Sequence, residues 1–115
     1  MILNNEDRNN MIEIYAKKSK TSLESAILLL SADDYDGAAN RAYYSIFQSE
    51  KALLLTKEII GNRHTHIHRN ISKEFIKTGE LPDDTYISIQ AAQGIRIAGD
   101  YSGTHFVTKE GFSTN

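Results

Sequence analysis

Histidines and arginines are concentrated in one short stretch, GNRHTHIHRN, at residues 61–70. Three histidines alternate there (His64, His66 and His68), and Arg63 and Arg69 flank them. Arg63 and His68 have an R-x4-H spacing that an acid–base ribonuclease could use, because histidine exchanges its proton near neutral pH. His64 and His68 are four residues apart, as two metal ligands on one helix face could be. The stretch is also compatible with a polar junction between two helices.

A helical conformation would separate these three histidines, because alternate residues of a helix differ by about 200° around its axis. Only His64 and His68 would then share a face, and the nearby sequence supplies no further ligands to close a site around a metal. We therefore expect no metal and no other cofactor.

Local charge is a second feature of this region, although the whole chain has a formal net charge of −2. Between Gly61 and Gly79 the only acidic residue is Glu74. The basic residues of this segment form a predicted basic patch, which consists of Arg63, Arg69, Lys73 and Lys77. Two interpretations remain open: a solvated helix face, or a surface that contacts RNA, a nucleotide phosphate or an acidic partner.

The composition describes an ordinary globular chain of 115 residues with 40% hydrophobic and 24% charged residues. This length favours a single domain over residues 1–115. Cysteine is absent, which excludes disulfides and thiolate chemistry. The longest apolar runs are far too short to span a membrane, and the N-terminal sequence lacks the pattern of a secretory signal. We expect a cytoplasmic protein without membrane contact.

Apolar residues recur at helical spacing through most of the chain. The first predicted helix has an apolar stripe made of Ile12, Tyr15, Ala16, Ser19, Leu23, Ala26, Ile27 and Leu30. Asp34 or Asp36 is expected to cap a second helix, which should run from about Tyr35 to Ile60 and stop at Gly61. This second helix is apolar around much of its circumference, so we expect it at the centre of the fold.

Two shorter helices are predicted after the histidine-rich stretch. The third should cover about Thr65 to Lys77, close at Gly79, and bury Ile67, Ile71, Phe75 and Ile76. The fourth should follow Pro82 and reach about Tyr101, with an inward row of Ile87, Ala91, Ile95 and Ala98. Four amphipathic helices with short connections predict an all-α fold, an antiparallel up-down four-helix bundle.

Three motifs in this order resemble the HEPN superfamily, in particular its small stand-alone, UPF0332-like branch. They are the AANRAYYSIFQSEKALLL helix, the FIKTGELP segment and the IRIAGDY segment. The matching positions are Arg41, Tyr43, Tyr44, Phe47, Ala52, Leu53 and Leu54, then His64, then Phe75, Lys77 and Gly79, and finally Arg96, Asp100 and Tyr101. Gly99 departs from this pattern, since the family usually has alanine there.

The resemblance implies a HEPN-like bundle that works as a binding or regulatory module. It also implies a homodimer, and association with a nucleotidyltransferase in a toxin–antitoxin or defence context. Members of the family usually continue with a fifth helix, which we expect to be short or absent here. An open apolar face would then be available to a partner or a second copy.

HEPN ribonucleases carry an R-x4-6-H motif on the helix that corresponds to the fourth one here. The arginine of that motif matches Arg96, but the expected window ends at Gly103 without a histidine. The catalytic candidates are therefore Arg96 and His105, or Arg96 with His64 if the fold brings the two together. We expect binding rather than catalysis. A metal-independent endoribonuclease toxin is the alternative, and a third interpretation is a nucleotide-binding domain that uses Arg41, Arg96 and the basic patch.

The resemblance also selects residues for nucleotide or RNA binding, namely Arg41, Tyr44, His64, Arg96, Asp100 and Tyr101. Simpler roles exist for some of them. Arg96 and Asp100 have the i, i+4 spacing of a surface ion pair, and Tyr101 could be a partly buried ring at a helix end. Arg41, on the most apolar helix, needs an acidic partner such as Asp100 or a polar groove.

Overall fold

The structure, a computed structural model, describes residues 3–61 and 63–101. Its elements are α1 (Asn5–Ser31), α2 (Tyr35–Thr56), α3 (His64–Ile71), the π-helical segment η1 (Ser72–Ile76) and α4 (Thr85–Tyr101). Every regular element in these residues is helical, which confirms the predicted all-α fold.

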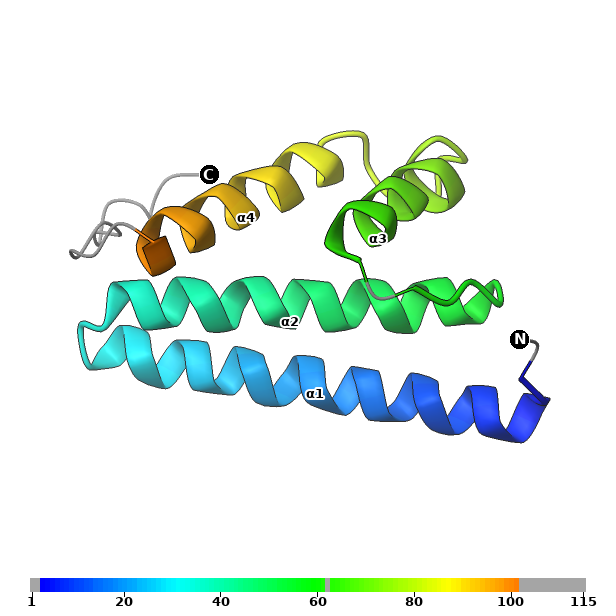
Figure 1. The fold of residues 1–115 in the computed structure, drawn as a ribbon, viewed down its shortest axis with the longest axis horizontal. Coiled ribbons are helices and arrows are strands. Elements are labelled where there is room, and N and C mark those ends of the chain that lie inside the picture. Colours follow the sequence, from blue (N-terminus) through cyan, green and yellow to red (C-terminus); the bar gives the residue numbers. More distant parts are fainter. Residues whose placement is uncertain (1–2, 62, 102–115) are drawn as a thin grey trace.

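The helix α2 lies in the middle of the fold, between α1 on one side and α3 and α4 on the other (Figure 1). The long helices α1 and α2 run antiparallel, and α3 and α4 lie along the opposite side of α2. The core combines α2 residues with residues of α3, η1 and α4, and includes Tyr43, Phe47, Leu54, Ile67 and Ile89. The prediction that the second helix is central is therefore confirmed.

Small polar side chains join α1 to α2. The Ser19 hydroxyl lies 2.6 Å from Ser49 Oγ and 2.8 Å from the carbonyl oxygen of Ser45. The Ser45 hydroxyl in turn donates to the Ser19 carbonyl at 2.9 Å. At the start of α2, Asp34 caps the helix by accepting a hydrogen bond from the Gly37 amide at 3.0 Å, as predicted.

The apolar stripe of α1 is only partly buried. Leu23 and Ile27, which we expected to face inward, are 50% and 59% exposed. The two residues lie at one edge of the stripe, and α1 packs against a single helix, α2, along a strip narrower than its apolar face. Part of that face therefore stays on the surface.

The second helix ends earlier than predicted. It stops at Thr56, and the chain turns through Glu58, whose φ of +60° lies in the left-handed region. The Glu58 carboxylate pairs with Arg8 of α1 at 3.0 Å. The predicted stop at Gly61 was wrong because the sequence signal for a glycine terminus does not reveal a left-handed glutamate.

The third helix agrees with its prediction on the buried side. All four expected residues are buried (Ile67, Ile71, Phe75 and Ile76). The helix changes at Ser72 into the π-helical η1, where the Lys77 amide bonds to the Ser72 carbonyl at 2.9 Å. Gly79 ends the segment with a φ of +84°, a conformation that favours glycine.

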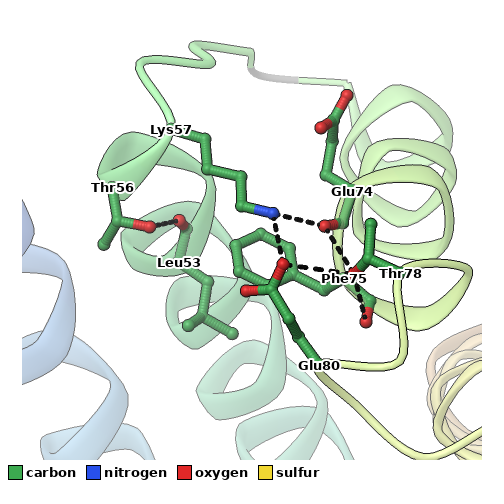
Figure 2. Close-up of polar contacts among 7 residues, drawn as sticks. All are labelled: Leu53, Thr56, Lys57, Glu74, Phe75, Thr78 and Glu80. Carbon is green, nitrogen blue, oxygen red and sulfur yellow. Dashed lines mark hydrogen bonds and ion pairs between the residues drawn. The ribbon is translucent and has the colours of Figure 1, made fainter.

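A lysine from the end of α2 holds the end of η1 in place (Figure 2). Lys57 Nζ donates to the Glu74 carbonyl oxygen at 2.5 Å and pairs with Glu80 Oε1 at 2.7 Å. The same ammonium lies 4.3 Å from the centre of the Phe75 ring. These contacts fix α3 and η1 against α2, and α3 carries two of the residues of the site.

The fourth helix buries a different face from the predicted one. Ile87 is 68% exposed and Ala91 is exposed, whereas Ile89 is 4% exposed. Tyr86, Ala92 and Arg96 are half-buried on the same side as Ile89. The sequence has isoleucines on both sides of this helix, so periodicity alone did not identify the buried side. The observed orientation brings Arg96 onto α2.

Membrane-spanning helices and three-residue metal clusters are absent from the described residues. None of their helices combines the length and apolar character that a bilayer-spanning helix requires. Their histidine, aspartate and glutamate side chains nowhere gather in threes with the geometry of a metal site.

Candidate functional site

Tyr43 of α2 is the centre of a polar cluster inside the fold. Its side chain is completely buried. The hydroxyl forms a hydrogen bond with Nδ1 of His64 and another, at 2.9 Å, with Nε2 of His68. Both histidines come from α3, so the i, i+4 pair that a metal could have used converges instead on one tyrosine hydroxyl.

Glu50 extends this cluster deeper into the protein. Its Oε2 lies 2.8 Å from Nδ1 of His68, and both side chains are almost completely buried. Burial raises the pKa of the Glu50 carboxyl, although the hydrogen bond from His68 opposes this effect. Burial, with a further contribution from the Glu50 charge, also raises the pKa of Tyr43 to about 12.

His64 lies at the outer end of the cluster and is half-buried. Its ring stacks on Phe47 with a centroid separation of 4.1 Å. Burial lowers the pKa of His64, and the positive charge of Arg96 lowers it further. Both effects favour the neutral imidazole of His64.

Two arginines surround Tyr44, which follows Tyr43 on α2. The Arg96 guanidinium lies 4.9 Å from the centre of the Tyr43 ring and 5.8 Å from that of Tyr44. The Arg41 guanidinium lies 5.0 Å from the centre of the Tyr44 ring and donates to Asn40 Oδ1 at 2.9 and 2.5 Å. Cation–π contacts and a neutral amide thus position the two guanidinium groups.

Four of the predicted nucleotide- or RNA-binding residues therefore come together from three helices. We call them the Tyr44 surface: Arg41, Tyr44, His64 and Arg96, all half-buried. The side chains of Asp100 and Tyr101, and the whole of His105, lie outside the described residues. The predicted Arg96–Asp100 pair and the catalytic role of His105 remain predictions.

The basic patch differs from the Tyr44 surface in the exposure of its side chains. Arg63, Arg69, Lys73 and Lys77 are all exposed. Arg63 immediately precedes α3, whereas His68 is 5% exposed and bound by Tyr43 and Glu50. The R-x4-H spacing of Arg63 and His68 therefore joins a surface residue to a core residue.

Sequence reasoning missed the roles of Tyr43, Glu50 and His68. A signal existed for Glu50, because positions 43, 47, 50 and 54 follow one helical row, and the other three are buried apolar or aromatic residues. A carboxylate in such a row must find a partner. The identity of that partner, His68, depends on how α3 packs on α2 and could not be read from spacing.

Comparison with known proteins is consistent with this fold. The HEPN domain model matches residues 12–114. A Methanocaldococcus jannaschii protein named "Putative toxin MJ0142" is 40% identical over 86% of this chain and 67% of its own length. A Thermotoga maritima UPF0332 protein is 32% identical over 83% of this chain and 72% of its own. No solved structure is a significant match. The chain belongs to the HEPN domain family and is similar to its UPF0332 proteins.

Proposed function

We propose that this chain is a toxin-like HEPN module that binds single-stranded RNA on the Tyr44 surface. The observation that carries the proposal is the convergence of Arg41 and Arg96 on one half-buried tyrosine ring. Guanidinium groups donate several hydrogen bonds in a plane and suit phosphate oxygens, and a guanidinium plane can itself stack on an unpaired base.

The charge distribution supports a local rather than a global attraction. The net charge of −2 gives no general basic field, so RNA would have to be held where cations are positioned. On the Tyr44 surface the two arginines are already positioned by ring and amide contacts. A positioned guanidinium loses less conformational freedom when it binds a phosphate than a mobile lysine does.

The names of two relatives support the toxin-like part of the proposal. Besides the relative described above, a second M. jannaschii protein, "Putative toxin MJ0605", is 30% identical over 85% of this chain. An RNA-binding surface would be in keeping with a protein of that kind.

Binding of a short fluorescently labelled single-stranded RNA tests the proposal. We expect Arg96→Ala to weaken binding about tenfold or more, which corresponds to about 1.4 kcal/mol. Arg69→Ala is the matched control, because it removes the same charge from the exposed basic patch. An equal loss in both variants, or no binding by the unchanged protein, would contradict the proposal.

Cleavage of the bound RNA is a second candidate function, favoured by the contact of both Arg96 and His64 with Tyr43. The lowered pKa of His64 favours the neutral form, which could accept a proton, while Arg96 would stabilise charge on the phosphate. Incubation of RNA with the protein and a chelator tests this. Activity that is lost in both His64→Ala and Arg96→Ala would establish it, and intact RNA would exclude it.

Association with partners rests on the family resemblance and on one surface. Leu23, Ile27 and Leu28 leave apolar area exposed on α1, with exposures of 50%, 59% and 69%. We propose that the chain forms a homodimer and that it associates with a nucleotidyltransferase. Light scattering of the purified protein tests the first part, and co-purification with a co-expressed nucleotidyltransferase tests the second.

A further inference from the structure

The hydrogen bonds that run from Glu50 to His64 form one continuous line through the protein. They connect Glu50 Oε2 to His68 Nδ1, His68 Nε2 to the Tyr43 hydroxyl, and that hydroxyl to His64 Nδ1. Each group in the line has a limited number of donors and acceptors, so the direction of one bond determines the next.

We propose that Glu50, His68 and Tyr43 are positioning residues that fix the tautomer of His64, with the proton on Nδ1 and the lone pair on Nε2. The Glu50 end of this line determines which atom donates the hydrogen in each bond. In its ionised form the Glu50 carboxylate only accepts hydrogen bonds, and Nδ1 of His68 then carries the hydrogen that faces Glu50.

The remaining bonds follow from that first one. In the neutral imidazole with its hydrogen on Nδ1, the lone pair of His68 is on Nε2, and this atom accepts the hydrogen of the Tyr43 hydroxyl at 2.9 Å. The Tyr43 oxygen has no further hydrogen to give and accepts one from Nδ1 of His64. The other ring nitrogen of His64, Nε2, is left without a hydrogen and is the atom that can accept one.

Burial protects this arrangement from exchange with water. Tyr43 is fully buried, and Glu50 and His68 are 3% and 5% exposed. A surface histidine, in contrast, samples both tautomers and favours the form with the hydrogen on Nε2. His66, two residues away on α3, is exposed and provides a reference within the same protein.

The arrangement gives the Tyr44 surface a specific chemistry, a consequence that rests on the proposed function. His64 would present a hydrogen-bond acceptor next to the Arg96 guanidinium. RNA carries a 2′-hydroxyl group that can donate to such an acceptor while its phosphate binds the arginine. DNA of the same sequence lacks that donor, so the line of bonds would favour RNA over DNA.

NMR spectroscopy of protein labelled with 15N in its histidines tests the proposal directly. Long-range 1H–15N correlation spectra distinguish the two neutral tautomers, and the pH should lie above about 6.5, the ordinary pKa of histidine. We expect the Nδ1–H form for His64 and the mixture dominated by Nε2–H for His66. An Nε2–H form of His64 in the unchanged protein would overturn the proposal.

Two variants separate the hydrogen-bond line from simple packing. Tyr43→Phe keeps the ring and removes the hydroxyl, and should return His64 to the mixture seen for His66, provided circular dichroism shows that the helices persist. Tyr44→Phe removes the neighbouring hydroxyl and should leave His64 unchanged, because Tyr44 meets His64 through its ring. A His64 tautomer that is the same in the unchanged protein and in Tyr43→Phe would contradict the proposal.

The tautomer of His64 is measured on the protein alone, so this test does not depend on RNA binding. A fixed Nδ1–H tautomer in a protein that binds no RNA would leave the positioning role intact and would reject the proposed function. RNA binding by a protein whose His64 behaves like His66 would reject the positioning role alone.

Discussion

The two faces of α3 show how differently the same residue type can be used within eight residues. On the inner face, His64 and His68 bond to Tyr43, and His68 also bonds to Glu50. On the outer face, His66 and Arg69 are exposed. The inner histidines are positioned by named partners, whereas the outer residues contribute charge.

Spacing in the sequence therefore does not by itself identify which charged residues form a site. The alternating histidines draw attention because they are close in sequence, but the helix divides them between core and solvent. The site is built from residues far apart in the sequence, Tyr43, His64 and Arg96, which three helices bring together. Substitutions on the inner and the outer face of α3 should therefore differ in their effects on stability and on its pH dependence.

The largest effect is expected at Ile67, which is 1% exposed on the inner face. Ile67→Ala should lower the free energy of unfolding by about 2–5 kcal/mol, because the core loses apolar contacts and gains a cavity. Urea unfolding followed by circular dichroism measures this. The adjacent His66→Ala, on the outer face, should change stability by no more than about 0.5 kcal/mol. Similar losses of unfolding free energy in Ile67→Ala and His66→Ala would contradict the difference between the two faces.

Removal of one buried hydroxyl should have the next largest effect. Tyr43→Phe deprives two histidine nitrogens of their partner, which should cost about 1–3 kcal/mol of unfolding free energy. Tyr44→Phe is the matched control on the half-buried neighbour. An unchanged urea midpoint in Tyr43→Phe would mean that the cluster adds nothing to stability.

Alkaline titration tests the burial of the same tyrosine. Its pKa is raised from 10.0 to about 12 in the folded protein, so the unfolded chain releases the proton first. Stability should be unaffected below pH 10 and fall as the pH rises from about 10 to about 12. Ultraviolet absorbance should show a late tyrosine ionisation step, and Tyr43→Phe should remove that step. Uniform ionisation near pH 10 would show that Tyr43 is accessible.

A smaller, opposite dependence is expected from His64 in acid. Because its pKa is lowered on folding, the unfolded chain takes up the proton first as the pH falls below about 6.5. His64 therefore contributes a loss of stability with falling pH, and His64→Gln should reduce that slope. His66→Gln is the comparison variant, at an exposed position of the same helix. Urea midpoints measured between pH 5 and pH 7 compare the two variants, and equal slopes in all three proteins would contradict the prediction.

Much of the fold could be predicted because it follows from local rules. Asp34 caps α2, Gly79 ends the segment after α3, and the inward row of Ile67, Ile71 and Phe75 appears as expected. These features depend on residues within a turn or two of one another.

The orientation of α4 and the buried Glu50–His68 pair could not be predicted in the same way. Isoleucines occur on both sides of α4, and Ile87 is exposed while Ile89 is buried. The spacing of the hydrophobic residues therefore did not identify the buried face of this helix. The spacing of Arg96 and Asp100 left both a surface ion pair and a binding role open for Arg96. Pairing of Glu50 with His68 joins residues 18 positions apart and depends on helix packing.

The π-helical segment η1 has a consequence for sequence alignment. Its hydrogen bond closes over five residues, where an α-helical turn closes over four, so the segment contains one residue more than an α-helix of equal rise. An α-helix would separate consecutive side chains by about 100°, yet Phe75 and Ile76 are both buried here. A relative that lacks one residue at this point could keep the same core with a regular helix, and a gap between positions 72 and 76 would then reflect equivalent structures.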